Sequence, residues 1–478
     1  MSKTRHSAIH ILNDHVLLNI FYLYRLDVSD GYDEDGDPNF DWGSQRWWYK
    51  LAQVCRWWRY LILASPLRLD LHLLCAPGVP IANMLAHSPP LPLIIYYRED
   101  VRETAEEDEE GFLLALLGHS DRVHYITLYL LAPKLRKIIT TMDKQFPILE
   151  RLYISSPTED DRSLMLPRTF QAPHLHHLYL WRAALPIGSP LLTTTVGLIT
   201  LVLGNIPPSA YFSPSNLLTQ LSLMPQLEKL VIQFYSPLPN RDVERQLMNT
   251  PIVTHITLPN LRRFSFKGVS AYMEGLLAQI NAPVLSELRI WLFSQLTFTA
   301  PRLLQFMDIS DTLRFSTVRL TFIDDAVELL AFQLVGERRY SFGVRIMCSH
   351  LDWQVSSASQ ILTALQPVFS AVEQLTLSHV GHSRSSEWHN EVDRTQWRQL
   401  LRPLSNLKTL HVQNELVGKL ACSLQADDGE SPLEILPNLK AVGYSGEDDT
   451  QDAFTQFTNE RRAAGYPVNL TTVDPFFY

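Results

Sequence analysis

A short pattern of apolar residues, apolar-x-x-apolar-x-apolar, recurs along most of the chain and is often preceded by proline. Clear copies read FPILERLYI from residue 146, MPQLEKLVI from residue 224 and LPNLKAVGY from residue 436. The alternation at the end of each copy predicts a short strand with one buried face. The first apolar position of the eleven copies falls at Val123, Leu149, Leu175, Leu198, Leu227, Leu261, Leu285, Phe315, Val372, Leu407 and Leu439.

The spacing of these copies indicates a repeat protein. Successive first positions lie 23 to 35 residues apart, except for a step of 57 residues from Phe315 to Val372. A weaker copy, FGVRIM from residue 342, is expected to divide that step in two. A period of this length with an L-x-x-L-x-L core is the signature of leucine-rich repeats. The sequence therefore predicts an α/β fold, a leucine-rich-repeat solenoid of about 11–12 irregular repeats.

The beginning of the chain has helical spacing instead. Asn13 and Asp14 favour a helix start, and the apolar residues after them predict an amphipathic helix. A second helix is expected from about Ser44 to Pro66, and the acidic stretch 27–41 predicts a solvated loop between the two. The apolar positions are Val16, Leu17, Ile20, Phe21 and Tyr24 in the first helix, and Leu51, Val54, Cys55, Trp58 and Ile62 in the second.

Tryptophan is concentrated in the second expected helix, at Trp47, Trp48, Trp57 and Trp58. Two helices have little interior in which to bury four indole rings, so we expect part of this apolar surface to be covered by something else. A simpler alternative is that the helices only cap the repeat domain, because apolar stripes at helical spacing are usually core.

Two stretches of this module, ILNDHVLLNIF at residues 11–21 and LAQVCRWWRYL at residues 51–61, resemble the F-box. The F-box pattern combines Leu-Pro, an acid, an apolar helix ending in Ile-Phe and a later Val-Cys-Arg-x-Trp run. Here Asn13 stands in place of the proline, and the acidic loop is longer. The chain is thus similar to fungal-type F-box proteins with leucine-rich repeats, the substrate-receptor family of SCF ubiquitin ligases.

The resemblance implies a function without catalytic residues. The helices would bind a Skp-type adaptor within a cullin complex, while the repeats would hold a protein substrate near the ubiquitin-charged enzyme. An alternative is a repeat scaffold for protein–protein assembly with a divergent F-box that takes no part in a ligase, and Asn13 keeps this alternative open. The expected adaptor-binding residues are Leu12, Val16, Leu17, Ile20, Phe21, Leu51, Val54, Cys55 and Trp58.

These patterns divide the chain into three expected parts. Residues 1–65 form the F-box helical module with the acidic loop 27–41, and residues 66–120 form a linker and a first solenoid unit with the acidic loop 98–110. Residues 121–478 form the leucine-rich-repeat domain with a C-terminal cap. The two acidic loops contribute −13 to the net charge of −9, which leaves +4 for the rest of the chain. That balance is too weakly basic to favour a nucleic-acid partner.

Cysteine usage and the absence of targeting signals favour a reducing compartment. The four cysteines lie far apart without C-x-x-C spacing, which argues against a disulfide framework and a thiolate metal site. The first ten residues lack the apolar core of a signal peptide. The sequence also contains no uninterrupted run of about 20 apolar residues, the length needed to span a membrane. We therefore expect a cytoplasmic or nuclear protein, or one present in both, with no membrane partner.

Motifs of the common enzyme classes are absent. The chain has no Walker loop and no G-x-S-x-G, H-E-x-x-H or G-x-G-x-x-G motif, so we expect neither enzymatic activity nor a cofactor. His174, His176 and His177 could in principle bind a metal. Because His176 and His177 are the outward positions of one copy, a surface role is favoured and no metal is expected.

Cations and one aromatic residue occupy predicted outward positions of the middle repeats. Stacked strands bring such side chains to within about 5 Å of one another, so cations dispersed in sequence become one local patch. We predict that this patch binds an acidic or phosphorylated segment of the substrate through charge-assisted hydrogen bonds. The alternative is an ordinary solvated face with scattered charges. The expected substrate-binding residues are Arg262, Arg263, Lys267, Arg289, Trp291 and Arg319.

Overall fold

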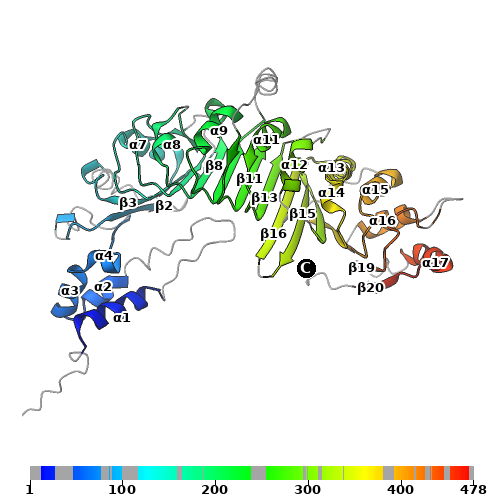
Figure 1. Cartoon of the computed structure of the whole chain (residues 1–478), viewed down its shortest axis with the longest axis horizontal. Coiled ribbons are helices and arrows are strands. Elements are labelled where there is room, and N and C mark those ends of the chain that lie inside the picture. The colour runs from blue at the N-terminus through cyan, green and yellow to red at the C-terminus, as the bar shows by residue number, and fades with distance from the viewer. Residues whose placement is uncertain are drawn as a thin grey trace, which may run out of the picture. The chain divides into compact units, whose positions relative to one another are not determined.

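The computed structural model is a mixed α/β chain with a large, mostly parallel sheet (Figure 1). It separates into two compact units, Met1–Thr195 and Val196–Tyr478. The division falls inside the region 121–478 that the sequence assigns to a single repeat domain. The structure describes residues 12–26, 47–76, 85–86, 89–98, 117–158, 164–186, 188–237, 255–293, 298, 300–309, 315–336, 338–380, 392–413, 416–425, 431, 433–445 and 453–472. Both expected acidic loops lie outside these residues, apart from Arg98.

The first unit begins with four helices, α1 (Asp14–Leu26), α2 (Trp47–Ala52), α3 (Arg56–Leu63) and α4 (Pro66–Leu69). The helix expected after Asn13 is confirmed, and the Asn13 side-chain oxygen Oδ1 accepts a hydrogen bond of 2.9 Å from the backbone N–H of Val16.

The expectation of one continuous second helix is wrong. The backbone is extended at Cys55, with φ −159° and ψ 169°, so α2 and α3 are separate helices. The Cys55 Sγ accepts a hydrogen bond from the N–H of Trp58 and thereby caps α3. Helical spacing alone cannot reveal such a break, because the apolar positions continue in phase across it.

Five parallel strands follow in the first unit, and each pairs with the next. Helices α7 (Ala132–Thr141) and α8 (Pro190–Thr194) belong to the same unit, as does a small pair formed by β5 (Leu164–Met165) and β7 (Ala183–Ala184). The five strands are β1 (Leu73–Cys75), β2 (Leu93–Arg98), β3 (Val123–Tyr129), β4 (Arg151–Ser155) and β6 (His177–Trp181). Strands β1 and β2 extend the sheet ahead of the first copy of the sequence pattern.

The second unit continues the same alternation of strands and helices. Parallel pairing joins β8 to β9, β9 to β11 and β11 to β13, and later β14 to β17, β17 to β18, β18 to β19 and β19 to β20. These strands are β8 (Thr200–Ile206), β9 (Lys229–Phe234), β11 (Arg263–Gly268), β13 (Glu287–Leu292), β14 (Thr317–Ile323), β17 (Gln374–Val380), β18 (Thr409–Gln413), β19 (Ala441–Ser445) and β20 (Asn469–Thr472).

The helices of the second unit lie along one side of its strands (Figure 1). They are α9 (Pro214–Leu221), α11 (Ser270–Leu277), α12 (Pro301–Ile309), α13 (Leu351–Ala364), α14 (Gln366–Phe369), α15 (Arg394–Leu401), α16 (Leu416–Leu424) and α17 (Thr455–Ala463), with a 3-10 helix η3 (Pro208–Ala210) and a short strand pair, β10 (Ile256–Thr257) with β12 (Ile280–Asn281). None of the helices that the structure describes is both long enough and apolar enough to cross a bilayer.

The strands expected from the repeated pattern are confirmed. Each of the eleven first apolar positions is at most 3% exposed. Ten of them lie two residues before a strand, and Val123 begins one. The apolar residues that follow alternate with half-buried ones, as in β6 and β14, because successive side chains of a strand point to opposite faces. The pattern therefore marks where each strand enters the core.

One part of the second unit departs from parallel stacking. The strand order there is β13, β16, β15, β14, β17, where β15 (Ala326–Val335) and β16 (Arg338–Met347) form an antiparallel hairpin. Gly336, with φ 61°, lies in the turn between them. The FGVRIM copy lies in β16, between β13 and β15, whereas β14 pairs directly with β17. The expectation that this copy divides the 57-residue step into two stacked repeats is therefore wrong.

Candidate interaction surfaces

The apolar stripe of α1 is split between the interior and the solvent. Leu17 is 0% exposed and Phe21 is 1% exposed, and the Phe21 ring packs edge-on against Trp58 with ring centroids 4.8 Å apart. Val16 and Ile20 are 38% and 45% exposed. The five apolar residues that the sequence places on one stripe thus divide into core residues and surface residues.

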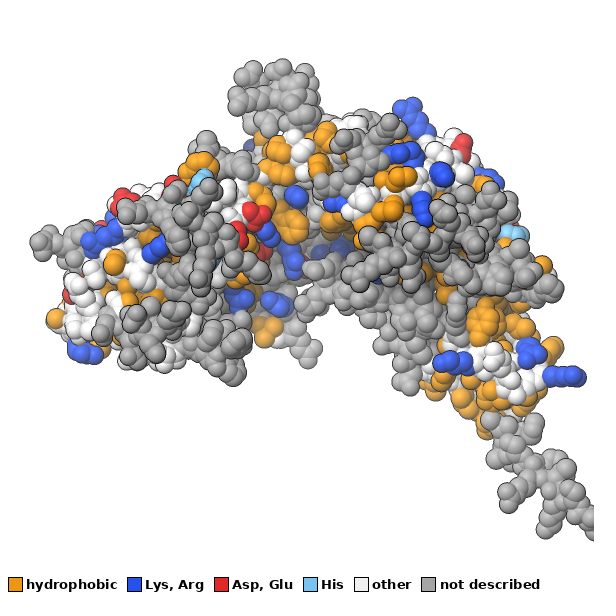
Figure 2. Space-filling model, turned by 180° about the vertical axis from the view of Figure 1, so that it is seen from behind, with side chains coloured by type: hydrophobic (Ala, Val, Ile, Leu, Met, Phe, Trp, Pro, Cys, Tyr) orange, Lys and Arg blue, Asp and Glu red, His pale blue; other side chains and the backbone are white. Residues whose placement is uncertain are grey.

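The other expected adaptor-binding residues are exposed or half-buried. Val54 is 59% exposed, whereas Leu12, Leu51, Cys55 and Trp58 are half-buried. Hydrophobic side chains are visible at the surface of the helical module in Figure 2. The exposed apolar side chains of this module, here called the apolar helix surface, are Val16, Ile20, Tyr22, Leu23, Tyr24, Val54, Tyr60 and Leu67. Among them, Tyr22, Leu23, Tyr60 and Leu67 were not selected from the sequence: the first three lie off the apolar stripes of the predicted helices, and Leu67 follows the predicted end of the second helix.

Two of the four clustered tryptophans are buried within the first unit. Trp47 and Trp48 are each 5% exposed. The indole N–H of Trp48 donates a hydrogen bond of 3.2 Å to the backbone carbonyl oxygen of His72, the residue before β1. Arg68 on α4 donates a hydrogen bond of 2.7 Å to Asn19 on α1. The cover that the sequence analysis expected for the tryptophans is thus provided in part by the chain itself.

The expected substrate-binding residues lie on β11, β13 and β14, with one exception. Arg263 and Lys267 alternate with buried phenylalanines on β11, and Arg289 and Trp291 alternate with buried Leu288, Ile290 and Leu292 on β13. Arg262 is exposed but precedes β11, at the edge of the sheet. The face that carries the half-buried and exposed residues of β11, β13 and β16 is here called the open sheet face.

The hairpin separates Arg319 from the other cations. Across the sheet, the register runs from Arg289 to Gly343 on β16, to Leu330 on β15 and then to Arg319 on β14. Three strand spacings correspond to about 14 Å. Arg319 is therefore a separate cation on the far side of the hairpin, and the predicted patch is interrupted by an apolar position.

The hairpin also supplies a cation that the sequence analysis missed. In the sheet register, Lys267 pairs with Trp291, and Trp291 pairs with Arg345 on β16. The alternating pattern that places Arg345 on the open sheet face was present in FGVRIM, where Phe342, Val344 and Ile346 are buried and Arg345 alternates with them. This pattern could not predict that the strand lies between β13 and β15.

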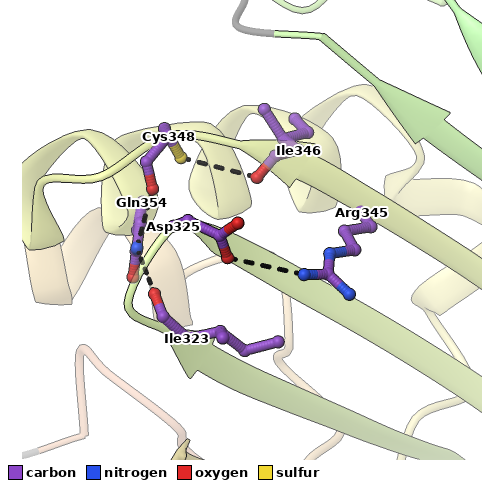
Figure 3. A network of polar contacts seen from close by, with 6 residues as sticks. All are labelled: Ile323, Asp325, Arg345, Ile346, Cys348 and Gln354. Carbon is purple, nitrogen blue, oxygen red and sulfur yellow. Dashed lines mark hydrogen bonds and ion pairs between the residues drawn. The ribbon is translucent and has the colours of Figure 1, made fainter. Parts of the chain in front are cut away.

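Ion pairs neutralise part of the open sheet face. Glu287 accepts from the Nε atoms of Arg289 at 2.7 Å and Arg263 at 3.5 Å. Arg345 pairs with Asp325 at 3.5 Å (Figure 3). For Lys267, burial lowers the pKa of the ammonium group, and the neighbouring guanidinium of Arg345 lowers it further. Lys267 thus forms no ion pair with a described residue and lies beside a guanidinium that is paired with Asp325.

A buried amide holds the end of the hairpin in place. Gln354 on α13 is 0% exposed, and its Nε2 donates to the carbonyl oxygens of Ile323 at 2.7 Å and Cys348 at 2.8 Å (Figure 3). Cys348 in turn donates from Sγ to the carbonyl oxygen of Ile346 at 3.6 Å. Burial raises the pKa of the Cys348 thiol to about 11, so it is a neutral thiol near pH 7. The network joins the end of β14 to the end of β16, the strand that carries Arg345.

The three histidines singled out from the sequence differ in their exposure. His174 is exposed, while His176 and His177 are half-buried. Burial lowers the pKa of His177 to about 4, and the nearby Arg151 guanidinium contributes to the shift. Within the part of the chain that the structure describes, no group of three or more His, Cys, Asp or Glu residues could hold a metal ion.

Comparison with known proteins yields weak structural likeness. No protein-family model matches the chain, and no curated protein matches it. Among solved structures, the chain is similar to the crystal structure of the leucine-rich repeat-containing protein LegL7 from Legionella pneumophila. The identity is 11%, the coverage is 82% of this chain and 97% of that chain, and the TM-score is 0.22. At that TM-score the two structures share too little spatial arrangement for a conclusion on fold or function.

Proposed function

We propose that the chain is a non-enzymatic substrate receptor of a cullin-based SCF ubiquitin ligase. In this proposal, the module of residues 1–65 acts as an F-box that binds a Skp-type adaptor, and the later strand-and-helix units form a leucine-rich-repeat solenoid that binds a protein substrate. The working compartment would be the cytoplasm, the nucleus or both. The chain would accelerate ubiquitin transfer by holding the substrate near the charged enzyme, and would contribute no catalytic group.

The observation that carries the proposal is the apolar helix surface. Val16, Ile20 and Val54 are exposed on a small helical module whose own interior is formed by other residues, including Leu17 and Phe21. An exposed group of large apolar side chains is typical of a protein-binding site. These residues also lie within the two stretches that resemble the F-box, so the surface and the resemblance support the same partner.

The replacement of the F-box proline by Asn13 is compatible with this proposal. Asn13 caps α1 through its Oδ1, and it therefore starts the helix that presents Val16 and Ile20. The departure from the F-box pattern changes how the helix begins and leaves its exposed apolar residues in place.

The repeat half of the proposal is supported by the strand positions. Strands that are led by a buried apolar residue, that pair in parallel and that alternate with helices are typical of leucine-rich repeats. Arg263, Lys267, Arg289 and Trp291 on the open sheet face are proposed contacts for the substrate, since arginine and tryptophan are enriched in binding hot spots.

The test is adaptor binding by a surface variant. We expect Ile20→Asp to reduce capture of a purified Skp-type adaptor by about tenfold or more, because a carboxylate would be buried in an apolar contact. Val284→Asp is the matched control: Val284 is also 45% exposed but belongs to the second unit, so adaptor capture should be unchanged. Leu17 is unsuitable for this test, because its side chain is core and its replacement would unfold the module.

A scaffold without ligase function is the second candidate. It is favoured if the wild-type chain captures no Skp-type adaptor while it still binds proteins through its repeats. Equal capture by wild type and Ile20→Asp would instead show that the adaptor contacts another surface, and would contradict the proposed F-box site.

A further inference from the structure

We propose that Lys267, Trp291 and Arg345 form a binding site for a carboxylate side chain of a partner protein, here called the Lys267–Arg345 site. The inference rests on the protein-binding role proposed above and specifies the chemistry of the partner. It adds a residue of the hairpin, Arg345, to the predicted surface. The occupant would be an acidic segment of the partner that lies on the open sheet face.

The register of three adjacent strands brings the site together. Lys267 on β11, Trp291 on β13 and Arg345 on β16 are consecutive positions of one row across the sheet. Neighbouring strands lie about 4.8 Å apart, so the two cations flank the indole within the reach of a single side chain. Without the antiparallel hairpin of β15 and β16, another strand would lie beside Trp291. The hairpin therefore completes the site.

The charges of this row are compensated on one side only. Arg345 faces Glu328 of β15 in the sheet register and pairs with Asp325, whereas Lys267 forms no ion pair or hydrogen bond with a described residue, and its Nζ lies 5.7 Å from the centre of the Phe293 ring. The Nε of Arg345 is buried without a hydrogen-bond partner, although another nitrogen of the same guanidinium pairs with Asp325. A half-buried ammonium beside a guanidinium is unfavourable without an anion, and a bound oxyanion would relieve that repulsion.

Another part of the same strands suggests which group would bind there. Four residues before Trp291 on β13, Glu287 accepts from its register partner Arg263 and from Arg289, which lies two residues further along β13. At Glu287 the chain supplies its own carboxylate to two cations, whereas the β13 residue between Lys267 and Arg345 is the indole of Trp291. We infer that the partner supplies the carboxylate there, and that an apolar residue next to it packs against Trp291.

The experiment uses the full-length chain and a labelled peptide in which Glu and Leu alternate. Binding is measured by fluorescence anisotropy. We expect saturable, salt-sensitive binding, and a loss of affinity of about tenfold for Lys267→Gln and for Arg345→Gln, since each removes one charge-assisted contact. The same peptide with Gln in place of Glu should bind at least about tenfold more weakly.

Lys440→Gln is the matched control, because Lys440 is an exposed cation just before β19 and outside the row; its affinity should stay within about twofold of wild type. Equal binding of the Glu and Gln peptides, or equal losses in all three variants, would contradict the site. A peptide with phosphoserine in place of Glu that binds while the Glu peptide does not would overturn the choice of carboxylate.

Adaptor capture by the same variants separates this inference from the proposed function. Lys267→Gln and Arg345→Gln should capture the Skp-type adaptor like wild type, since both belong to the second unit. Peptide binding without any adaptor capture would leave the site standing and contradict the ligase role. Adaptor capture without peptide binding would support the ligase role and contradict the site.

Discussion

The indole N–H of Trp48 donates a hydrogen bond of 3.2 Å to the backbone carbonyl oxygen of His72 and so joins helix α2 to the residue that precedes strand β1. Both residues are buried, at 5% and 3% exposure. The contact connects the helical module to the first strand of the same unit. A tryptophan cluster that looks like a binding surface in the sequence therefore has a structural role as well.

We expect Trp48→Phe to destabilise the first unit by about 2 kcal/mol, because the carbonyl of His72 loses its indole donor and the smaller ring leaves a cavity. Chemical denaturation followed by circular dichroism measures the change. Trp353→Phe is the control, since Trp353 is 51% exposed and should alter stability little. Equal effects of the two substitutions would show that the Trp48 contact contributes nothing specific.

Replacing the buried amide of Gln354 should loosen the end of the hairpin. Gln354→Met keeps the approximate volume but removes the hydrogen bonds to Ile323 and Cys348, at an expected cost of about 2–3 kcal/mol. Amide hydrogen exchange should become faster near residue 346 on β16. Gln366→Met, at an exposed position on α14, should leave both stability and exchange unchanged, and unchanged exchange in Gln354→Met would refute the role of the network.

The buried guanidinium of Arg461 stabilises the C-terminal part of the second unit. Arg461 on α17 is 0% exposed and donates to the carbonyl oxygens of Leu436 at 3.1 Å and Pro437 at 3.3 Å. Leu436 has a positive φ of 54°, so these bonds hold an unfavourable turn. We expect Arg461→Met to lower the free energy of unfolding by about 3 kcal/mol, and Arg462→Met, at the exposed neighbouring position, to change it by less than about 0.5 kcal/mol.

Acidification should destabilise the first unit partly through His177. In the folded chain the pKa of His177 is lowered from 6.5 to about 4, so the unfolded chain binds a proton at a higher pH than the folded chain does. Stability is then complete above pH 6.5 and falls as the pH drops toward 4. The loss should be on the order of 1–2 kcal/mol, because the ring is only partly buried.

Thermal unfolding of His177→Gln between pH 7 and pH 4 tests that expectation, because the variant should lose less stability over this range than wild type. His174→Gln, at an exposed position of the same copy, should follow the wild-type profile. Parallel profiles for wild type and His177→Gln would assign the acid sensitivity to other groups.

Local patterns in the sequence predicted the strands well. Positions such as Leu227 and Leu261 precede strands and are completely buried, because the alternation of side chains along a strand depends only on neighbouring residues. The first helix and its Asn13 cap were predictable for the same reason. The break at Cys55 was not, since it depends on one residue adopting an extended backbone within an otherwise continuous helical pattern.

By itself, the sequence determined the first helix, the strands that follow the repeated apolar pattern and the residues of those strands that enter the core. Only the tertiary structure decided which side of α1 is buried, because that depends on the packing of Phe21 against Trp58. It also decided that β16 lies beside β13, which brings Arg345 to Trp291 and moves Arg319 away. Pairing between strands distant in the chain depends on the summed free energy of many long-range contacts. A short apolar motif carries no information about which partner strand gives the most favourable sum.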